Sequence, residues 1–186
     1  MDRRAATEPG PVRADEAPVV LCVATDGPEA TRALAAALAP LLSDGDLLVL
    51  TGDLGAGKTC FTQGLGVGLG VDERITSPTF TLVAEYEGRL RLHHLDVYRL
   101  DGPGDTGDLD LHELAEEGVT VVEWGERIDP VLGADRLLIE LTFPDLGQDG
   151  ESGDDDRLLR IEPVGERWRA RAEAMASALG PWAVPC

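Results

Sequence analysis

Residues Gly52–Thr59 read GDLGAGKT and match the pattern GxxxxGK[ST] at every fixed position. This spacing is typical of a phosphate-binding loop (P-loop), in which a glycine-rich backbone presents several N–H groups to one phosphate. Glycine suits such a loop because side chains would block the close approach of backbone and ligand. In this arrangement Lys58 contacts the β- and γ-phosphates, and the Thr59 hydroxyl binds Mg²⁺. The sequence therefore predicts a site for a nucleoside triphosphate with magnesium.

The cation inside this loop is unusual for the chain. Lys58 is the only lysine among the 16 lysine and arginine residues, and all the others are arginines. A compact ammonium group fits between phosphates where a planar guanidinium fits poorly. A lysine at this one position of an arginine-rich sequence therefore supports phosphate binding.

A magnesium site of this kind also needs a carboxylate, normally at the end of a neighbouring apolar strand. Asp96 ends the segment LRLHHLD and Glu123 ends VTVVE, so both are candidates, with an exposed acid at a strand end as the alternative for each. His93 and His94 also lie in the first of these segments, but adjacent strand residues point to opposite faces. We therefore predict that His94 packs or hydrogen bonds near the site, and not that the pair binds zinc.

The elements that must position these residues are predicted from apolar patterning. The run at Leu47–Thr51 lacks alternation, which indicates a strand buried on both faces of a parallel sheet. The turn Glu87-Gly88-Arg89 between two apolar segments predicts a hairpin. The other predicted strands are Pro18–Thr25, Phe80–Tyr86, Leu90–Val97, Val119–Val122, Leu137–Phe143 and Leu158–Ile161. The predicted helices cover 27–42, the segment after Lys58 (which frays into glycines 64–70), Leu109–Glu117 and Arg167–Leu179.

Helices that alternate with buried strands favour an α/β fold. We predict a single small P-loop NTPase domain over 19–180, with a mixed, partly antiparallel central sheet flanked by helices. Residues 1–18 are polar and contain three prolines, which is typical of a disordered tail. Residues 144–156 carry six acids and no cation, and we interpret them as a solvated acidic hairpin loop.

The composition excludes several functions. The formal net charge is −19, and such a surface repels nucleic-acid phosphates and anionic lipids, so we expect no direct nucleic-acid or membrane binding. No apolar run approaches the length of about 20 residues that a membrane span needs, and the N-terminus has no secretory signal pattern. The three cysteines are widely spaced without a CxxC pair, so we expect neither a disulfide framework nor a zinc site. These features predict a cytoplasmic protein in a reducing compartment.

The phosphate-binding loop alone is compatible with several classes of nucleotide-binding protein. A GTPase of the usual kind is excluded because the sequence has no asparagine for an NKxD guanine-binding motif. The later glycines do not form GxGxxG, so a Rossmann dinucleotide site is not supported. A small-molecule kinase and a regulatory ATP-binding module that does not hydrolyse ATP both remain open as alternatives to an ATPase.

Four motifs together resemble one family. The loop GDLGAGKT is followed by SPTFTLV at Ser77–Val83, HLDVYRL at His94–Leu100 and VVEWGE at Val121–Glu126. This series is similar to the bacterial TsaE family of small P-loop ATPases, which are needed to make threonylcarbamoyladenosine in tRNA. The resemblance extends from about Thr25 to Val164. One departure is Gly125, which stands where the family often has proline.

The resemblance implies ATP and Mg²⁺ as the ligands. It implies that nucleotide is bound by Gly55, Ala56, Gly57, Lys58, Thr59 and Cys60, that Mg²⁺ is bound by Thr59 and Glu123, and that catalysis uses Lys58, Asp96 and Glu123. Asp96 is expected to position water or the metal shell, and Ser77–Phe80 matches a switch-like segment. Trp124 is expected either to couple the site to a partner or to pack in the core.

The same resemblance implies protein partners. They are TsaD and TsaB, with which a slow ATPase resets or gates the transfer complex, while tRNA is reached only through that complex. No DNA or membrane partner is expected.

Arg157 is expected to approach the nucleotide from the last hairpin.

Overall fold

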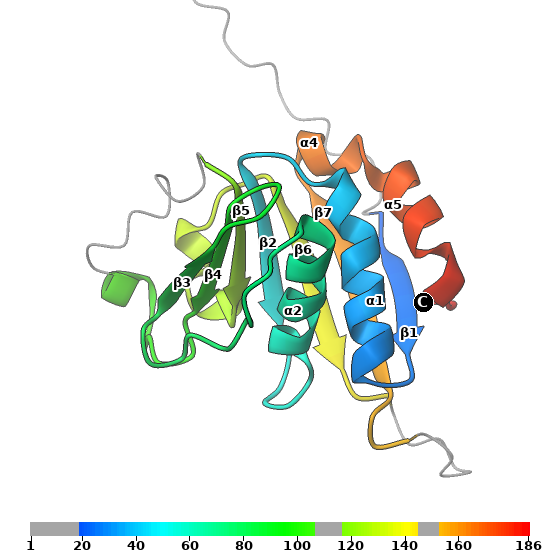
Figure 1. Ribbon diagram of the computed structural model, residues 1–186, viewed down its shortest axis with the longest axis horizontal. Helices are drawn as coiled ribbons and strands as arrows, with labels where there is room; N and C mark the ends of the chain where they lie inside the picture. Colours follow the sequence, from blue (N-terminus) through cyan, green and yellow to red (C-terminus); the bar gives the residue numbers. More distant parts are fainter. Residues whose placement is uncertain (1–18, 107–116, 145–152) are drawn as a thin grey trace, which may run out of the picture.

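The computed structural model describes residues 19–106, 117–144 and 153–186. Within these residues the chain forms a seven-stranded sheet with the order β1-β7-β6-β2-β5-β4-β3 (Figure 1). Its strands are β1 (Leu21–Thr25), β2 (Asp46–Thr51), β3 (Val83–Tyr86), β4 (Leu92–Asp96), β5 (Val119–Glu123), β6 (Arg136–Thr142) and β7 (Arg157–Val164).

The centre of the sheet is parallel and its two edges are antiparallel. β2 pairs in parallel with both β5 and β6, and β4 pairs in parallel with β5. The hairpins β3–β4 and β6–β7 and the pair β1–β7 are antiparallel. All but the last residue of β2 are buried, as expected for a strand covered on both faces. The predicted α/β fold with a mixed, partly antiparallel sheet is confirmed.

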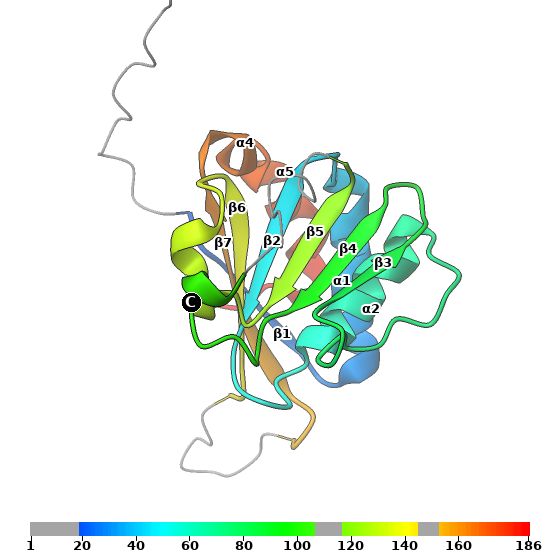
Figure 2. The same ribbon diagram turned by 90° about the vertical axis from the view of Figure 1, so that its left-hand side faces the viewer.

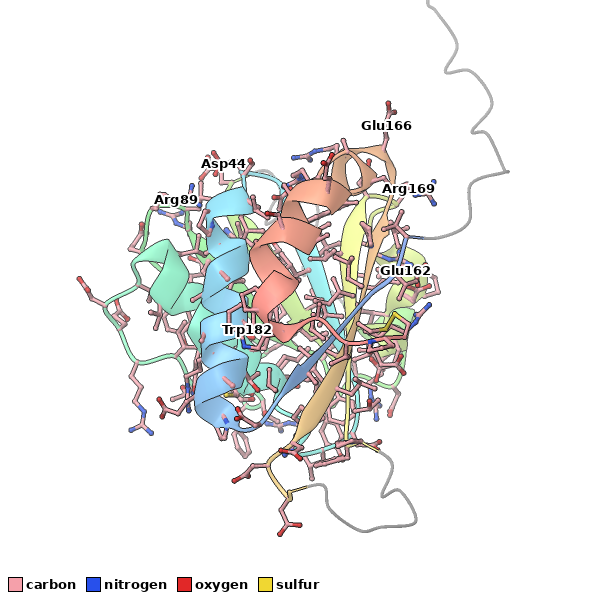
Figure 3. The ribbon with its side chains drawn as sticks, turned by 90° about the vertical axis from the view of Figure 1, so that its right-hand side faces the viewer. Asp44, Arg89, Glu162, Glu166, Arg169 and Trp182 are labelled. Carbon is pink, nitrogen blue, oxygen red and sulfur yellow. A yellow bond between two sulfur atoms is a disulfide. The ribbon has the colours of Figure 1, made fainter. Side chains whose placement is uncertain are left out.

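Helices cover one face of this sheet. They are α1 (Pro28–Leu38), α2 (Lys58–Leu69), α4 (Glu166–Arg169) and α5 (Ala172–Leu179), and α1 and α5 lie side by side against the sheet in Figure 3. Their apolar residues join the larger core cluster, which includes Leu34, Phe61 and Met175. The opposite face has a smaller core under the 3₁₀ turns Gly125–Arg127 and Asp129–Val131, which lie in front of the sheet in Figure 2. Further 3₁₀ turns cover Ala39–Leu41, Pro103–Thr106 and Gly180–Trp182.

The glycines of α2 do not fray the helix, contrary to the prediction. α2 continues to Leu69 and ends at Gly70, a left-handed C-cap with φ 76°. Gly64 and Gly68 lie where α2 meets α1, and a Cβ at either position would collide with the α1 backbone at Arg32 or Ala36. These glycines therefore allow the two helices to pack closely, which outweighs their low helix propensity.

Other predicted boundaries shift for local reasons. The strand predicted from Phe80 begins only at Val83, because 78–82 form a turn in which Leu82 has φ 69°. The predicted closing helix is broken into α4 and α5 at Ala170–Arg171. The predicted tail at 1–18, nearly all of the predicted helix Leu109–Glu117 and most of the acidic loop lie outside the described residues. The acidic loop does connect the two strands of the β6–β7 hairpin.

The expectation of no disulfide was wrong for one pair of cysteines. Cys22 and Cys186 form a disulfide, with their Cα atoms 5.2 Å apart (Figure 3). The pairing is possible because the segment after α5 returns along β1: Ala183 forms a β-bridge with Val23, and the Val184 N–H donates to the Cys22 carbonyl at 2.9 Å. The disulfide could not be predicted from the sequence, because the two cysteines are separated by 164 positions.

Among the described residues, no helix has the length and apolar character needed to cross a membrane.

Candidate nucleotide site

The candidate site lies at the carboxyl edge of the parallel strands. β2, β4 and β5 all end at this edge, because they run in the same direction. The loop after β2 leads into α2, while Asp96 and Glu123 are the last residues of β4 and β5 and are register partners. Ligand sites of open α/β sheets are found at this edge. The loop and both predicted carboxylates are therefore brought together.

The loop has the backbone geometry that its glycines predict. Gly57 is the N-cap of α2 with φ 106°, a left-handed conformation that disfavours other residues. Gly55 has φ 81°, and apart from Gly55 and its two chain neighbours no residue has an atom within 4 Å of the position that a Cβ would occupy there. α2 has no side-chain cap at its N-terminus, so its first N–H groups and its dipole point toward the space above the loop.

Lys58 is folded back onto this loop. Its Nζ donates hydrogen bonds to the carbonyl oxygens of Gly52 at 2.6 Å and Asp53 at 2.9 Å. Burial lowers the pKa of Lys58 below its ordinary value of 10.5, although the charges of Glu123 and other nearby carboxylates oppose this shift. The ammonium is thus held beside the loop, and its hydrogen-bond acceptors among the described residues are neutral carbonyls.

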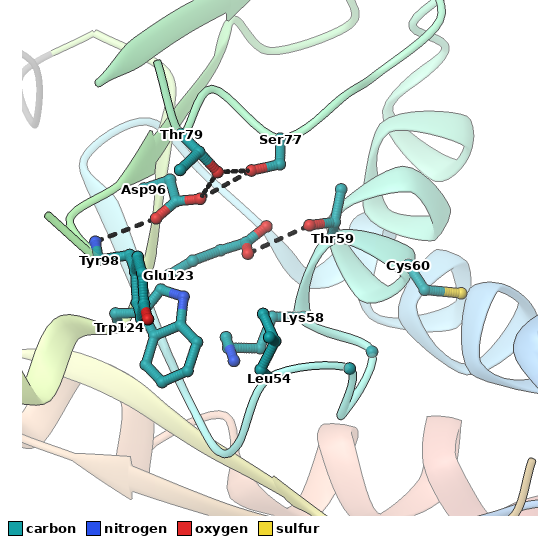
Figure 4. A pocket seen from close by; sticks show the side chains of 12 residues that line it. Leu54, Lys58, Thr59, Cys60, Ser77, Thr79, Asp96, Tyr98, Glu123 and Trp124 are labelled. Atoms are coloured by element: carbon teal, nitrogen blue, oxygen red, sulfur yellow. Dashed lines mark hydrogen bonds between the residues drawn. The ribbon is translucent and has the colours of Figure 1, made fainter. Parts of the chain in front are cut away.

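Glu123 joins the loop to the centre of the sheet. Its Oε2 accepts a hydrogen bond from the Thr59 hydroxyl at 3.1 Å, and its Oε1 lies 2.7 Å from His94 Nε2 (Figure 4 shows the contact with Thr59). Only 3% of Glu123 is exposed, so the alternative of an exposed strand-end acid does not hold. His94 is buried and hydrogen bonded near the site, as predicted.

Asp96 is held by a separate set of donors. Its Oδ2 accepts from the hydroxyls of Ser77 at 2.7 Å and Thr79 at 2.5 Å, and its Oδ1 accepts from the Tyr98 N–H at 3.0 Å (Figure 4). Burial alone would raise the pKa of Asp96, but the hydrogen bonds from Thr79, Ser77 and Tyr98 outweigh it, and the pKa falls below its ordinary value. Asp96 is therefore a carboxylate at neutral pH and is not an exposed acid.

Trp124 follows Glu123 and covers Lys58. Its backbone is left-handed, with φ 64°, and the Lys58 Nζ lies 3.5 Å from the centre of its ring. The ring is half-buried and also contacts Tyr98, with centroids 4.9 Å apart. Trp124 therefore lines the site itself, a position that neither the partner-coupling nor the core-packing interpretation had described.

These residues surround a pocket of about 440 Å³. It is lined by Leu54, Gly55, Gly57, Lys58, Thr59, Cys60, Ser77, Thr79, Asp96, Tyr98, Glu123 and Trp124 (Figure 4). Sequence reasoning did not identify Leu54 and Tyr98 as lining residues. The residue types of Leu54 and Tyr98 do not indicate that they line a pocket, because the loops that carry them come together only in the folded chain.

A second pocket of about 250 Å³ adjoins the loop on its other side. It shares Gly55, Gly57 and Cys60 with the first pocket and extends to Pro28 and Arg32 of α1. The guanidinium of Arg157 binds the carbonyls of Ala56 at 3.1 Å and Gly55 at 3.2 Å. Burial raises the pKa of the Cys60 thiol, which lies 3.2 Å from the Pro28 carbonyl, so Cys60 is a neutral thiol here.

The donor set fits a magnesium ion that shares its coordination with phosphates. Mg²⁺ prefers oxygen ligands and is commonly held by one or two protein groups, with water and phosphate oxygens as the others. The Thr59 hydroxyl and the Glu123 carboxylate supply such oxygens next to the loop. Within the described residues, no group of three or more His, Cys, Asp or Glu side chains is arranged to bind a metal alone. A bound magnesium would therefore take its remaining ligands from water and from nucleotide phosphates.

The comparison with known families agrees with this geometry. Residues 25–149 match the family model described as "Threonylcarbamoyl adenosine biosynthesis protein TsaE". The chain belongs to the TsaE family. TsaE proteins are named for the biosynthesis of the modified nucleoside threonylcarbamoyladenosine in tRNA.

Individual TsaE proteins are similar over most of their length. The chain is 40% identical to the tRNA threonylcarbamoyladenosine biosynthesis protein TsaE of Bacillus subtilis, covering 82% of this chain and 91% of the relative. It is 44% identical to the TsaE protein of Streptomyces coelicolor, covering 74% of this chain and 93% of the relative. A crystal structure of Bacillus subtilis YdiB has a TM-score of 0.72 and 36% identity, with 88% of this chain and 98% of the YdiB chain covered.

Proposed function

We propose that this chain is a magnesium-dependent ATPase that acts in the threonylcarbamoyladenosine modification of tRNA, together with TsaD and TsaB. The observation that carries the proposal is the meeting of Lys58, Thr59, Asp96 and Glu123 around one glycine-lined pocket. Membership of the TsaE family supports the tRNA pathway. The ATPase activity and the two partners are expectations from that family resemblance.

The loop supplies the contacts that a triphosphate needs. The N-terminus of α2 and the Gly55–Gly57 backbone favour a negatively charged phosphate group. Lys58 would exchange the carbonyls of Gly52 and Asp53 for phosphate oxygens, whose negative charge attracts its ammonium more strongly. The adjoining pocket beside Pro28, Arg32 and Arg157 is open to the rest of the nucleotide.

Two carboxylates divide the remaining tasks. Thr59 and Glu123 would hold magnesium, which neutralises charge on the β- and γ-phosphate oxygens when it is bound. Asp96 is fixed by Ser77 and Thr79 and is charged at neutral pH, so it can accept a hydrogen bond from an attacking water. Lys58 would stabilise the negative charge that develops on the phosphate oxygens as the bond to the γ-phosphate breaks.

The rim of the pocket supports a protein partner. Leu54 and Phe80 are apolar residues that are 80% and 90% exposed. Phe80 sits under the Arg99 guanidinium at 4.4 Å, and Arg99 also donates to the Thr79 carbonyl at 2.8 Å, next to the Asp96 hydrogen-bond donors. A partner that covers Phe80 would therefore contact the segment that positions Asp96. The net charge of −19 favours such a protein partner over direct contact with tRNA.

Phosphate release from Mg-ATP tests the proposal, measured for the chain alone, with TsaD and TsaB, and with tRNA added. We expect slow release by the chain alone and faster release with the partners, together with tRNA modification that depends on this chain. Modification that proceeds equally well without the chain would contradict the proposal. Transfer of the γ-phosphate to an acceptor other than water would favour a small-molecule kinase instead.

A further inference from the structure

The two adjacent histidines of β4 occupy different environments. His93 and His94 are both buried, but they project to opposite faces of the sheet. His93 has an acceptor at each ring nitrogen: the Glu85 carboxylate at 3.2 Å from Nδ1 and the Glu117 carbonyl at 2.6 Å from Nε2. His94 has Glu123 at 2.7 Å from Nε2, while its Nδ1 has no hydrogen-bond partner within the described residues.

This asymmetry assigns the proton on His94. A carboxylate oxygen can only accept, so the short contact to Glu123 requires a proton on Nε2. A proton on Nδ1 would leave a buried donor unsatisfied, at a cost larger than that of an unpaired acceptor. The cross-strand neighbours of His94 are Ala84 and Val121, whose side chains offer Nδ1 no polar group. The contact with Glu123 therefore places a proton on Nε2 of His94.

The contact also decides how Glu123 is turned. Oε1 is occupied by His94, which leaves Oε2 as the oxygen beside the Thr59 hydroxyl. Both side chains are buried, and Glu123, at the end of β5, has more rotatable side-chain bonds than His94. The hydrogen bond from the His94 ring therefore restricts the Glu123 carboxylate to the orientation that faces the phosphate-binding loop.

We propose that His94 is a positioning residue for magnesium: by donating from Nε2 to Glu123 Oε1, it presents Oε2, together with the Thr59 hydroxyl, to the ion. This inference rests on the proposed function, because it concerns the metal of the same nucleotide site. Partners that orient a metal ligand from behind typically change metal affinity by about 10- to 100-fold when they are removed. His94 itself touches neither metal nor nucleotide in this role.

Three variants of the full-length chain separate positioning from simple packing. His94→Leu replaces the ring with an apolar side chain of moderate size and removes the hydrogen-bond donor. His94→Gln also removes the ring but retains an N–H donor. His93→Gln is the matched control, because it changes an equally buried neighbour that is also bonded to a carboxylate but faces away from the site. Circular dichroism and thermal unfolding establish that each variant folds.

Calorimetry with ADP, in MgCl₂ and separately in EDTA, measures the gain in affinity that magnesium provides. We expect His94→Leu to reduce this gain by about 10- to 100-fold while its affinity in EDTA stays unchanged. His94→Gln should restore most of the gain, and His93→Gln should leave it intact. If His94→Leu keeps the full gain, or loses affinity equally in EDTA, the positioning role is wrong. If the wild-type chain shows no magnesium-dependent gain, the proposed function itself fails.

Long-range ¹H–¹⁵N NMR spectra of the metal-free chain give an independent reading. We expect the His94 ring to carry its proton on Nε2, and we expect this signal to be assigned by its disappearance in His94→Leu. A His94 ring protonated on Nδ1 alone would overturn the inference, whatever the calorimetry shows.

Discussion

The ammonium nitrogen of Lys58 lies 3.5 Å from the centre of the Trp124 ring, and Trp124 directly follows Glu123 in the chain. The residue that follows the carboxylate at the end of β5 thus contacts the cation of the phosphate-binding loop. This contact holds Lys58 in the same position as its hydrogen bonds to the Gly52 and Asp53 carbonyls. A phosphate that draws Lys58 forward must break these contacts, so Trp124 should report on binding.

Addition of Mg-ADP should therefore change the fluorescence of Trp124, because the charge over its ring moves away. The change should disappear in Trp124→Phe, which leaves the buried Trp168 and the half-buried Trp182 as the remaining indoles. It should also disappear in Lys58→Ala at ligand concentrations that saturate the wild-type chain. A signal of full size in Trp124→Phe would show that the fluorescence change does not come from movement of Lys58 away from this ring.

Replacement of either site carboxylate should separate hydrolysis from binding. We expect Asp96→Ala to bind ATP with nearly unchanged affinity and Glu123→Ala to bind it more weakly in magnesium, because Glu123 would hold the ion. At saturating ATP both variants should release phosphate at least about tenfold more slowly, because a group that acts in the transition state is lost. Neither variant should support tRNA modification with TsaD and TsaB. Full modification by a variant that binds ATP without cleaving it would instead favour a regulatory ATP-binding module.

The hydrogen bonds to Asp96 should make folding stability depend on pH. The pKa of Asp96 is lowered in the fold, so its contribution is complete above the ordinary value of 3.8 and is lost as the pH falls through the lower folded value. The double variant Ser77→Ala/Thr79→Val removes both hydroxyl donors. It should be less stable than the wild type by about 1–2 kcal/mol at neutral pH, since Ser77 is exposed and solvent weakens its contribution.

This difference in unfolding free energy should shrink as the pH is lowered from neutral to below 3.8. Denaturant unfolding of both proteins at each pH provides the measurement, and comparison of the two cancels the contributions of the many other acids. A difference that stays constant across this range would contradict the assigned cause of the Asp96 shift.

The ion pair between the buried Asp46 and the partly exposed Arg171 should affect stability but not ATP hydrolysis. Asp46 is 1% exposed, and its carboxylate binds the Arg171 guanidinium through two contacts of 2.6 and 2.7 Å. Asp46→Ala would leave Arg171 without its charge partner and should destabilise the fold by about 3 kcal/mol. Arg160→Ala breaks a pair between an exposed arginine and the partly exposed Glu162, and it should cost less than about 1 kcal/mol. Equal losses in urea unfolding would show that burial of the Asp46 pair contributes nothing.

The sequence predicted the parts of the site that depend on local pattern. The loop at Gly52–Thr59 has a fixed spacing, and Asp96 and Glu123 end apolar strands, so their meeting at one sheet edge follows from parallel pairing. The prediction for His94 succeeded for the same reason, since alternation along β4 places it on the face of Asp96.

Contacts between distant segments could not be predicted in this way. The hydroxyls of Ser77 and Thr79 reach Asp96 only because the loop before β3 folds back over the end of β4. The pairing of Asp46 with Arg171 spans 125 positions and depends on the break between α4 and α5. Local propensity contains no information about contacts between residues that lie so far apart in the sequence. It also led to the wrong prediction for the α2 glycines, which allow the close contact between α2 and α1.

The function proposed for this chain requires that the glycine-lined pocket with Lys58 binds a magnesium-bound adenine nucleotide. Titration calorimetry of Mg-ADP into the wild-type chain and into Lys58→Ala provides the decisive test. We predict saturable binding by the wild type and an affinity about 10- to 100-fold lower in Lys58→Ala, because one charge-assisted contact of roughly 1.5–3 kcal/mol is lost. No binding by the folded wild type at millimolar nucleotide, or equal binding by the two proteins, would contradict this assignment.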